Sequence, residues 1–64
     1  VNDKDQKGLT PLMIATENGD KDIVQLLLEN EADVNLHDYS GKTALIIATE
    51  HRYTDLIKLL LEYK

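Results

Sequence analysis

The sequence contains no cysteine, no tryptophan and no phenylalanine, and one proline among its 64 residues. Without cysteine the chain can form no disulfide and no thiolate zinc site. A chain of about 60 residues buries only roughly 60% of the surface of its unfolded state, so its core is marginal. We therefore expect packing alone to hold the fold together.

Long apolar segments are also missing. No uninterrupted apolar run exceeds five residues, whereas a helix that crosses a bilayer needs about 20. The segment 1–5 lacks the basic start and apolar block of a secretory signal. The sequence predicts no membrane association and, with the absence of cysteine, favours an intracellular, most simply cytoplasmic, protein.

Basic residues are fewer than acidic ones. Seven Lys and Arg against twelve Asp and Glu give a formal net charge of −5. Nucleic-acid binding relies on a basic face that neutralises phosphates, so this balance predicts no nucleic-acid partner. An acidic surface instead favours solubility and basic partners.

The sequence repeats itself with a period of 33 residues. Of the 31 pairs of residues that lie 33 positions apart, 15 are identical. The clearest matches join residues 8–17 to residues 41–50 and residues 26–29 to residues 59–62. A period of this size is typical of a solenoid, in which each repeat packs on its neighbours.

The first half of a period contains the signals of a turn and a helix. Asp5 and Gly8 mark the turn, because Asp accepts hydrogen bonds from nearby backbone and Gly adopts positive φ readily. Thr10 stands in the N-cap position and Pro11 in the first helical position. The pattern predicts a helix over residues 11–18 that stops at Gly19.

A second helix is predicted after the glycine. Asp20 is suited to cap it, and apolar residues follow with helical spacing. These apolar residues occupy most of its circumference, so we expect it to be covered on more than one side. The leucine runs 26–28 and 59–61 are accordingly predicted to be core between neighbouring repeats. Helices of two or three turns are not stable alone in water, so each depends on its neighbours.

These patterns resemble the ankyrin repeat. The resemblance rests on Asp5-x-x-Gly8-x-Thr10-Pro11-Leu12, Gly19, Ile23-Val24-x-Leu26-Leu27-Leu28 and Ala32-Asp33-Val34-Asn35. It implies an all-α fold, an ankyrin-repeat solenoid of helix-turn-helix units joined by β-hairpin-like finger loops. It also implies a single domain, 1–64, with repeat one at about 3–35 and repeat two at about 36–64, in an array that continues beyond the chain.

The chain departs from the ankyrin pattern at several positions. Arg52 replaces the glycine of the first repeat, and Glu31 stands where the family has glycine before Ala-Asp-Val-Asn. Both positions end a helix in the left-handed region, so we expect either a strained backbone or another turn there. The family's histidine is Met13 in one repeat and Ile46 in the other. Its hydrogen bond to the capping threonine is lost, and the start of the helix is expected to be less firmly held.

No pattern predicts chemistry. The calcium-like pattern at residues 3–14 lacks an oxygen ligand at its fifth position and Glu at its twelfth. His37 and His51 have no second ligand at metal-binding spacing. Together, His37, Asp38 and Ser40 are too crowded in sequence to form a nucleophilic triad. We therefore predict no metal, no cofactor and no enzyme activity.

The resemblance implies a scaffold that binds another protein through its finger tips and the concave face of its helices. Positions that vary in the family then supply the candidate contact residues, which are Gln6, Lys7, Leu9, Glu17, Asn18, Asn30, Tyr39, Ser40, Lys42, Glu50, His51 and Tyr63. Tyr39 and Tyr63 are candidate anchors, because Tyr is enriched in binding hot spots. Tyr53 is instead expected to pack between helices.

Two other functions stay open. A solenoid usually needs about three repeats with polar outer faces, but this chain has two, and its last helix, residues 56–61, is as apolar as an internal one. The chain is then a structural spacer, or it self-associates through uncapped repeat ends. Alternatively, it is a regulatory segment of a larger enzyme.

Overall fold

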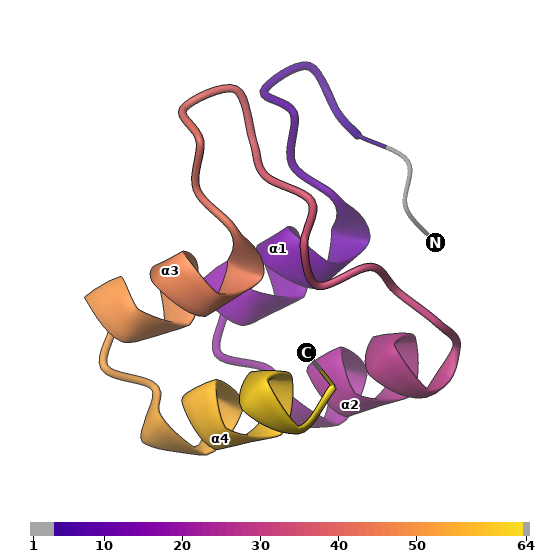
Figure 1. Ribbon diagram of the computed structural model, residues 1–64, viewed down its shortest axis with the longest axis vertical. Helices are drawn as coiled ribbons and strands as arrows, with labels where there is room; N and C mark the ends of the chain where they lie inside the picture. The colour runs from indigo at the N-terminus through magenta and orange to yellow at the C-terminus, as the bar shows by residue number, and fades with distance from the viewer. Residues whose placement is uncertain (1–3, 64) are drawn as a thin grey trace.

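The computed structural model describes residues 4–63, which form four α-helices. The helices are α1 (Pro11–Glu17), α2 (Lys21–Glu29), α3 (Ala44–Glu50) and α4 (Thr54–Glu62). Figure 1 shows α1 beside α3 and α2 beside α4, with the loops before α1 and α3 rising as two adjacent fingers. The described residues contain no β-strand, although one isolated antiparallel bridge joins His37 to Thr43 at the base of the second finger. The predicted all-α class is confirmed.

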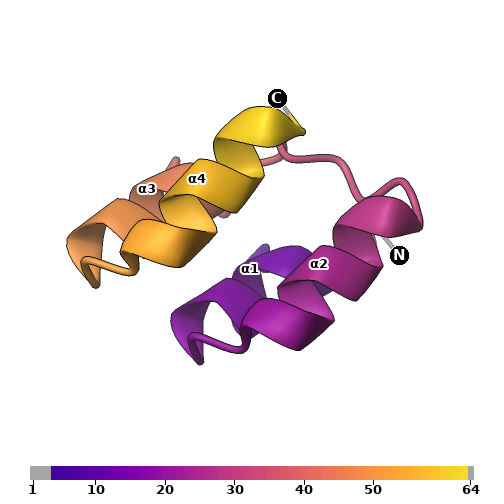
Figure 2. The ribbon, with the colours of Figure 1, turned by 90° about the horizontal axis from the view of Figure 1, so that it is seen from below.

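The helices stack as two pairs. Seen from below in Figure 2, α1 and α2 form one pair and α3 and α4 lie alongside as the second. Within residues 4–63, no helix has the length and apolar character required to cross a membrane. The predicted outer limits of the repeats, residues 3 and 64, lie outside the described residues, as do the first residues of the calcium-like pattern and of the region compared with a secretory signal.

The helices of the first repeat begin at the predicted caps. The Met13 N–H donates to Thr10 Oγ1 over 3.3 Å, and the Ile23 N–H donates to Asp20 Oδ1 over 3.4 Å. The first helix ends one residue earlier than predicted, because Asn18 is its C-cap rather than its last helical residue. The local sequence signals therefore fix these helix boundaries to within one residue.

The two non-glycine residues at the predicted left-handed positions do adopt positive φ. Glu31 has φ of 67° and Arg52 has φ of 59°. For a residue with a Cβ atom this conformation costs roughly 1–2 kcal/mol. The strained backbone, rather than another turn, is the outcome at both positions.

A continuous apolar core joins the two pairs of helices. Its buried side chains come from both repeats, with Leu12, Met13, Ala15, Val24, Leu28 and Ala32 in the first and Ala44, Ile47, Ala48, Leu56 and Leu60 in the second. Within each repeat the first helix packs on the second helix, so that α1 packs on α2 and α3 on α4. Between the repeats, α1 packs on α3. Burial between repeats therefore stabilises helices that are too short to form alone.

The prediction that both leucine runs are core is wrong for two residues. Leu26 is 58% exposed and Leu61 is 49% exposed, whereas Leu28 and Leu60 are buried. Leu61 is the equivalent of Leu28, 33 residues later in the sequence. The two differ because α4 packs against α2 in the stack, while nothing in the described chain packs on the corresponding side of α4.

Two tyrosines of the second repeat lie on glycines of the first. A Cβ atom on Gly8 would lie 2.8 Å from the Tyr39 ring, and one on Gly19 would lie 3.0 Å from the Tyr53 ring. The Tyr53 hydroxyl also donates to the backbone oxygen of Glu17 over 3.3 Å. The prediction that Tyr53 packs between helices is confirmed. Glycine at these positions lets the second repeat approach the first closely.

Candidate protein-binding surface

The two finger tips are held by the same aspartate turn. In the second finger, Asp38 Oδ1 accepts hydrogen bonds from the N–H groups of Ser40 over 2.8 Å and Lys42 over 2.9 Å. In the first finger, Asp5 accepts the equivalent pair from the residues two and four positions later. The Lys42 N–H, helped by the Ser40 N–H and the Lys42 charge, holds the pKa of Asp38 below its ordinary value. The carboxylates thus fix the shape of the fingers.

A groove lies where the fingers meet the end of α1. Its volume is about 390 Å³, and its lining residues are Lys7, Leu9, Glu17, Asp38, Tyr39 and Ser40. Five of these six residues are predicted contact residues, brought together from both fingers and one helix. The sixth, Asp38, is not a predicted contact residue, and its carboxylate holds the turn of the second finger. The groove combines an apolar side chain, an aromatic ring and charges of both signs.

Two further predicted residues form an ion pair in the second repeat. Lys42 Nζ lies 3.1 Å from Glu50 Oε1, and both side chains are nearly half exposed. The remaining finger residue, Gln6, is exposed at the tip of the first finger. An exposed pair of this kind contributes little to stability, about 0–1 kcal/mol, but it determines which charges the surface offers.

The other four predicted contact residues are not part of the groove. Asn18, Asn30, His51 and Tyr63 are the C-caps of the four helices. Asn30 Nδ2 donates to a backbone oxygen of α2 over 2.7 Å, and His51 Nδ1 lies 2.9 Å from a backbone oxygen of α3. The His51 ring also stacks on the Tyr53 ring, with centroids 5.2 Å apart. For Asn30 and His51 the structure therefore shows a role in ending a helix.

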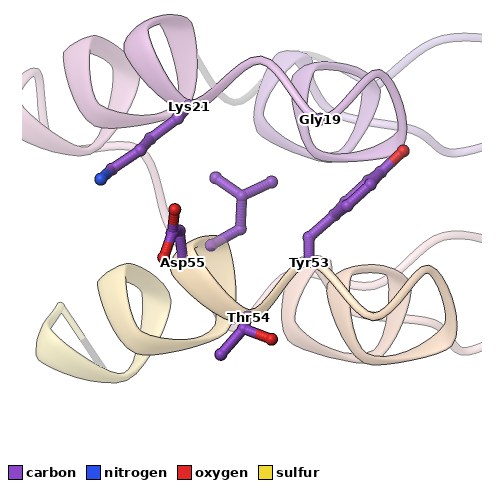
Figure 3. Close-up of a pocket in the computed structure, with 6 residues that line it drawn as sticks. Gly19, Lys21, Tyr53, Thr54 and Asp55 are labelled. Atoms are coloured by element: carbon purple, nitrogen blue, oxygen red, sulfur yellow. The ribbon is translucent and has the colours of Figure 1, made fainter.

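A second surface, which the sequence did not indicate, lies between the outer helices. Figure 3 shows Lys21 of α2 and Asp55 of α4 on facing sides of a shallow cavity of about 240 Å³, with Tyr53 directed toward Gly19. A neighbouring cavity of about 300 Å³ shares Lys21 and Asp55, and its other lining residues are Gln25, Lys58, Leu59 and Glu62. Lysines and carboxylates that alternate across two helices could have indicated this surface in the sequence. Its residues offer no nucleophile with a positioned base.

The described residues provide no metal centre. Within residues 4–63, no three His, Cys, Asp or Glu side chains lie close enough together to hold an ion.

Comparison with known proteins places the chain among repeat proteins. The family model for ankyrin repeats (3 copies) matches residues 1–64. The chain is 60% identical over 37 residues to the ankyrin repeat and KH domain-containing protein mask of Drosophila melanogaster, a match that covers 58% of this chain and 1% of that protein.

In structure, the chain is similar to a chain in the complex of the Bd0816 predatory endopeptidase from Bdellovibrio bacteriovorus with the immunity protein Bd3460. The TM-score is 0.93 and the sequence identity 35%, over 97% of this chain and 32% of that chain. The chain therefore spans about a third or less of the length of these two relatives.

Ankyrin repeats are generally protein–protein interaction modules without enzymatic activity. The family model covers the whole sequence, and the neighbouring structure has the same helical stack. The resemblance carried by the repeated motifs of the sequence is thereby confirmed. The chain belongs to the ankyrin-repeat family.

Proposed function

We propose that the chain binds a partner protein through its finger tips and the concave face of α1 and α3, across the groove where the fingers meet the end of α1. The observation that carries this proposal is the contrast between the finger residues that hold the turn and the finger residues that line the groove. Finger residues that hold the turn are identical in the two repeats, as in Asp5 and Asp38 or Gly8 and Gly41. Apart from Asp38, the finger residues that line the groove differ from their equivalents in the other repeat, as in Lys7 and Ser40, so the shared frame displays different side chains.

The comparisons support the same function at a coarser level. The neighbouring structure from Bdellovibrio bacteriovorus is a complex of an endopeptidase with an immunity protein. The exposed Tyr39, which lines the groove, has the large area and polar tip that are typical of binding hot spots. The groove therefore offers both an anchor and a variable set of charges.

Alanine substitutions in full-length protein test this proposal. We expect Tyr39→Ala to weaken binding to a co-purified partner by at least about 2 kcal/mol, the size of a hot-spot effect. Lys42→Ala should have a smaller effect, and Lys58→Ala on the exposed face of α4 is its matched control. Binding that survives both Tyr39→Ala and Lys42→Ala but is lost with Lys58→Ala would place the partner on the outer helices instead.

A second proposal concerns the two ends of the stack. We propose that another repeat covers each end, either from a longer array or from a second copy that self-associates end to end. Met13 is 1% exposed, whereas its equivalent Ile46 is 43% exposed; conversely, Ile14 is 41% exposed, whereas its equivalent Ile47 is 2% exposed. Each side chain is buried where the other repeat lies against it. The two outer ends of the stack therefore expose the same kinds of surface that pack against each other between the repeats.

The oligomeric state of the chain tests this second proposal. Sedimentation over a wide range of concentrations should show association that Ile46→Glu abolishes and the control Lys58→Glu does not. A monomer at every concentration, with cooperative unfolding, would contradict it. We also propose a single domain whose repeats span about 3–35 and 36–64. A regulatory role within a larger enzyme stays a hypothesis.

A further inference from the structure

We propose that the groove holds an arginine side chain of the partner, with its guanidinium on the Glu17 carboxylate and beside the Tyr39 ring. This inference rests on the proposed binding across the groove and narrows the partner to a basic segment that carries arginine. It rests on a comparison of the two repeats, because the equivalent carboxylate of the second repeat, Glu50, is already paired with a lysine.

The internal comparison concerns two carboxylates at equivalent positions. Glu50 is paired with Lys42 at 3.1 Å. The residue equivalent to Glu50 in the first repeat is Glu17, and the residue equivalent to Lys42 is Leu9. Among the described residues, the Glu17 carboxylate makes no ion pair or hydrogen bond. The first repeat therefore keeps the anion and lacks the cation.

The groove around Glu17 suits a long side chain with a planar cation. Leu9 is half-buried and offers apolar surface to the methylene groups of such a side chain. Tyr39 is 73% exposed, yet its ring lies on Gly8 and its N–H donates to the Lys7 backbone oxygen over 3.3 Å. One side of the ring thus lies against Gly8, and most of the ring is open to a partner.

This combination favours arginine over lysine. A guanidinium stacks on an aromatic face and donates two parallel hydrogen bonds to one carboxylate, whereas an ammonium acts as a compact point charge. Both required groups, Glu17 and Tyr39, line the same groove. The net charge of −5 also attracts a basic segment.

Two other charges line the groove and act in opposite senses. The Asp38 carboxylate already accepts the N–H groups of Ser40 and Lys42, so it is committed to the finger turn. Lys7 is exposed and repels an incoming cation. Removing this repulsion with Lys7→Gln should strengthen arginine binding about twofold.

An NMR titration with acetyl-Gly-Arg-Gly-amide tests the inference on the 64-residue chain. The control peptide carries citrulline, which has the shape of arginine without its charge. We expect the arginine peptide to shift the amide signals of Leu9, Glu17 and Tyr39 and to bind at least about tenfold more tightly than the citrulline peptide. Should the chain alone give the spectrum of an unfolded protein, the same titration is made with a polar capping repeat at each end.

Three variants make the test specific. Glu17→Gln should weaken binding of the arginine peptide about fivefold or more, whereas the matched control Glu50→Gln should leave it unchanged. Leu9→Lys should abolish binding, because the new lysine would pair with Glu17 as Lys42 pairs with Glu50. Each variant must keep the dispersed amide signals of the folded chain.

The outcomes separate this inference from the function on which it rests. Equal binding of both peptides, or full binding by Glu17→Gln or Leu9→Lys, would overturn the arginine site. If Tyr39→Ala still weakened binding of the full-length protein to its partner, the groove would remain the binding surface for a different chemistry. We expect binding of the arginine peptide to be weakened in Glu17→Gln, lost in Leu9→Lys and unchanged in Glu50→Gln.

Discussion

The two repeats share a frame but begin their second helices differently. In the first repeat, Gly19 takes the positive φ and Asp20 caps α2 with its carboxylate. In the second, Arg52 takes the positive φ, and Tyr53 gives α4 no side-chain cap. Tyr53 instead packs on Gly19 and donates to the Glu17 backbone oxygen. The second repeat therefore has weaker local signals and depends more on contact with the first.

The largest expected difference between the repeats concerns two equivalent leucines, one buried and one half exposed. Leu28→Ala should lower the free energy of unfolding by about 2–5 kcal/mol, because it removes a buried side chain and leaves a cavity. Leu61→Ala should lower it by less than about 1 kcal/mol, since that side chain is half exposed. Urea unfolding followed by circular dichroism measures both. Equal losses would mean that another surface covers Leu61.

Two equivalent glycines allow the energetic contribution of the contact between the fingers to be measured separately from that of the backbone. Gly8 and Gly41 have nearly the same positive φ, of 83° and 85°. A Cβ atom at Gly8 would lie 2.8 Å from the Tyr39 backbone nitrogen, whereas one at Gly41 would meet nothing within 4 Å. Gly41→Ala should cost about 1–2 kcal/mol through the backbone alone.

We expect Gly8→Ala to cost about 1–3 kcal/mol more, because the second finger must also move. Thermal unfolding of the two variants, compared with the unchanged chain, gives the difference. Equal destabilisation would show that the close approach of Tyr39 to Gly8 contributes nothing.

The strained cap of the second repeat can be relieved. Arg52→Gly should raise the free energy of unfolding by about 1 kcal/mol, because glycine adopts positive φ without steric cost. Arg52→Lys keeps the Cβ atom and the charge and should give no gain. Denaturant titration of both variants decides this, and a gain in the lysine variant alone would show that backbone strain is not the cause.

The smallest expected effect concerns the pH dependence of the finger turn. The pKa of Asp38 is lowered in the folded chain, chiefly by the Lys42 N–H. Its contribution to stability is therefore present above its unfolded value near 3.8 and lost as the pH falls through the lower folded value. Asp38→Asn should flatten the acid side of the stability profile. An unchanged profile for that variant would mean that other carboxylates cause the acid sensitivity.

Much of the fold follows from local signals in the sequence. Thr10 and Asp20 cap helices as predicted, because capping depends on residues only a few positions away. The missing glycines at Glu31 and Arg52 left two outcomes open, a strained backbone or another turn, and both residues adopt the strained positive φ. The period of 33 predicts a solenoid, and the resemblance to the ankyrin repeat implies its finger loops.

The features that depend on the arrangement of the repeats could not be predicted. The ion pair between Lys42 and Glu50 joins a finger to a helix, so its geometry exists only after folding. The exposure of Leu26 depends on which side of the repeat is covered, and the period does not encode this. The contact of Tyr39 with Gly8 likewise requires two fingers at close range. The assignment of contact residues stays a prediction.

The measurement that tests the central proposal most directly is hydrogen exchange of the full-length protein with and without its co-purified partner. Binding across the groove should slow exchange in residues 6–9 and 39–42 and leave the outer helices α2 and α4 unchanged. Slower exchange confined to Lys21–Glu29 and Thr54–Glu62, with unchanged fingers, would contradict the account.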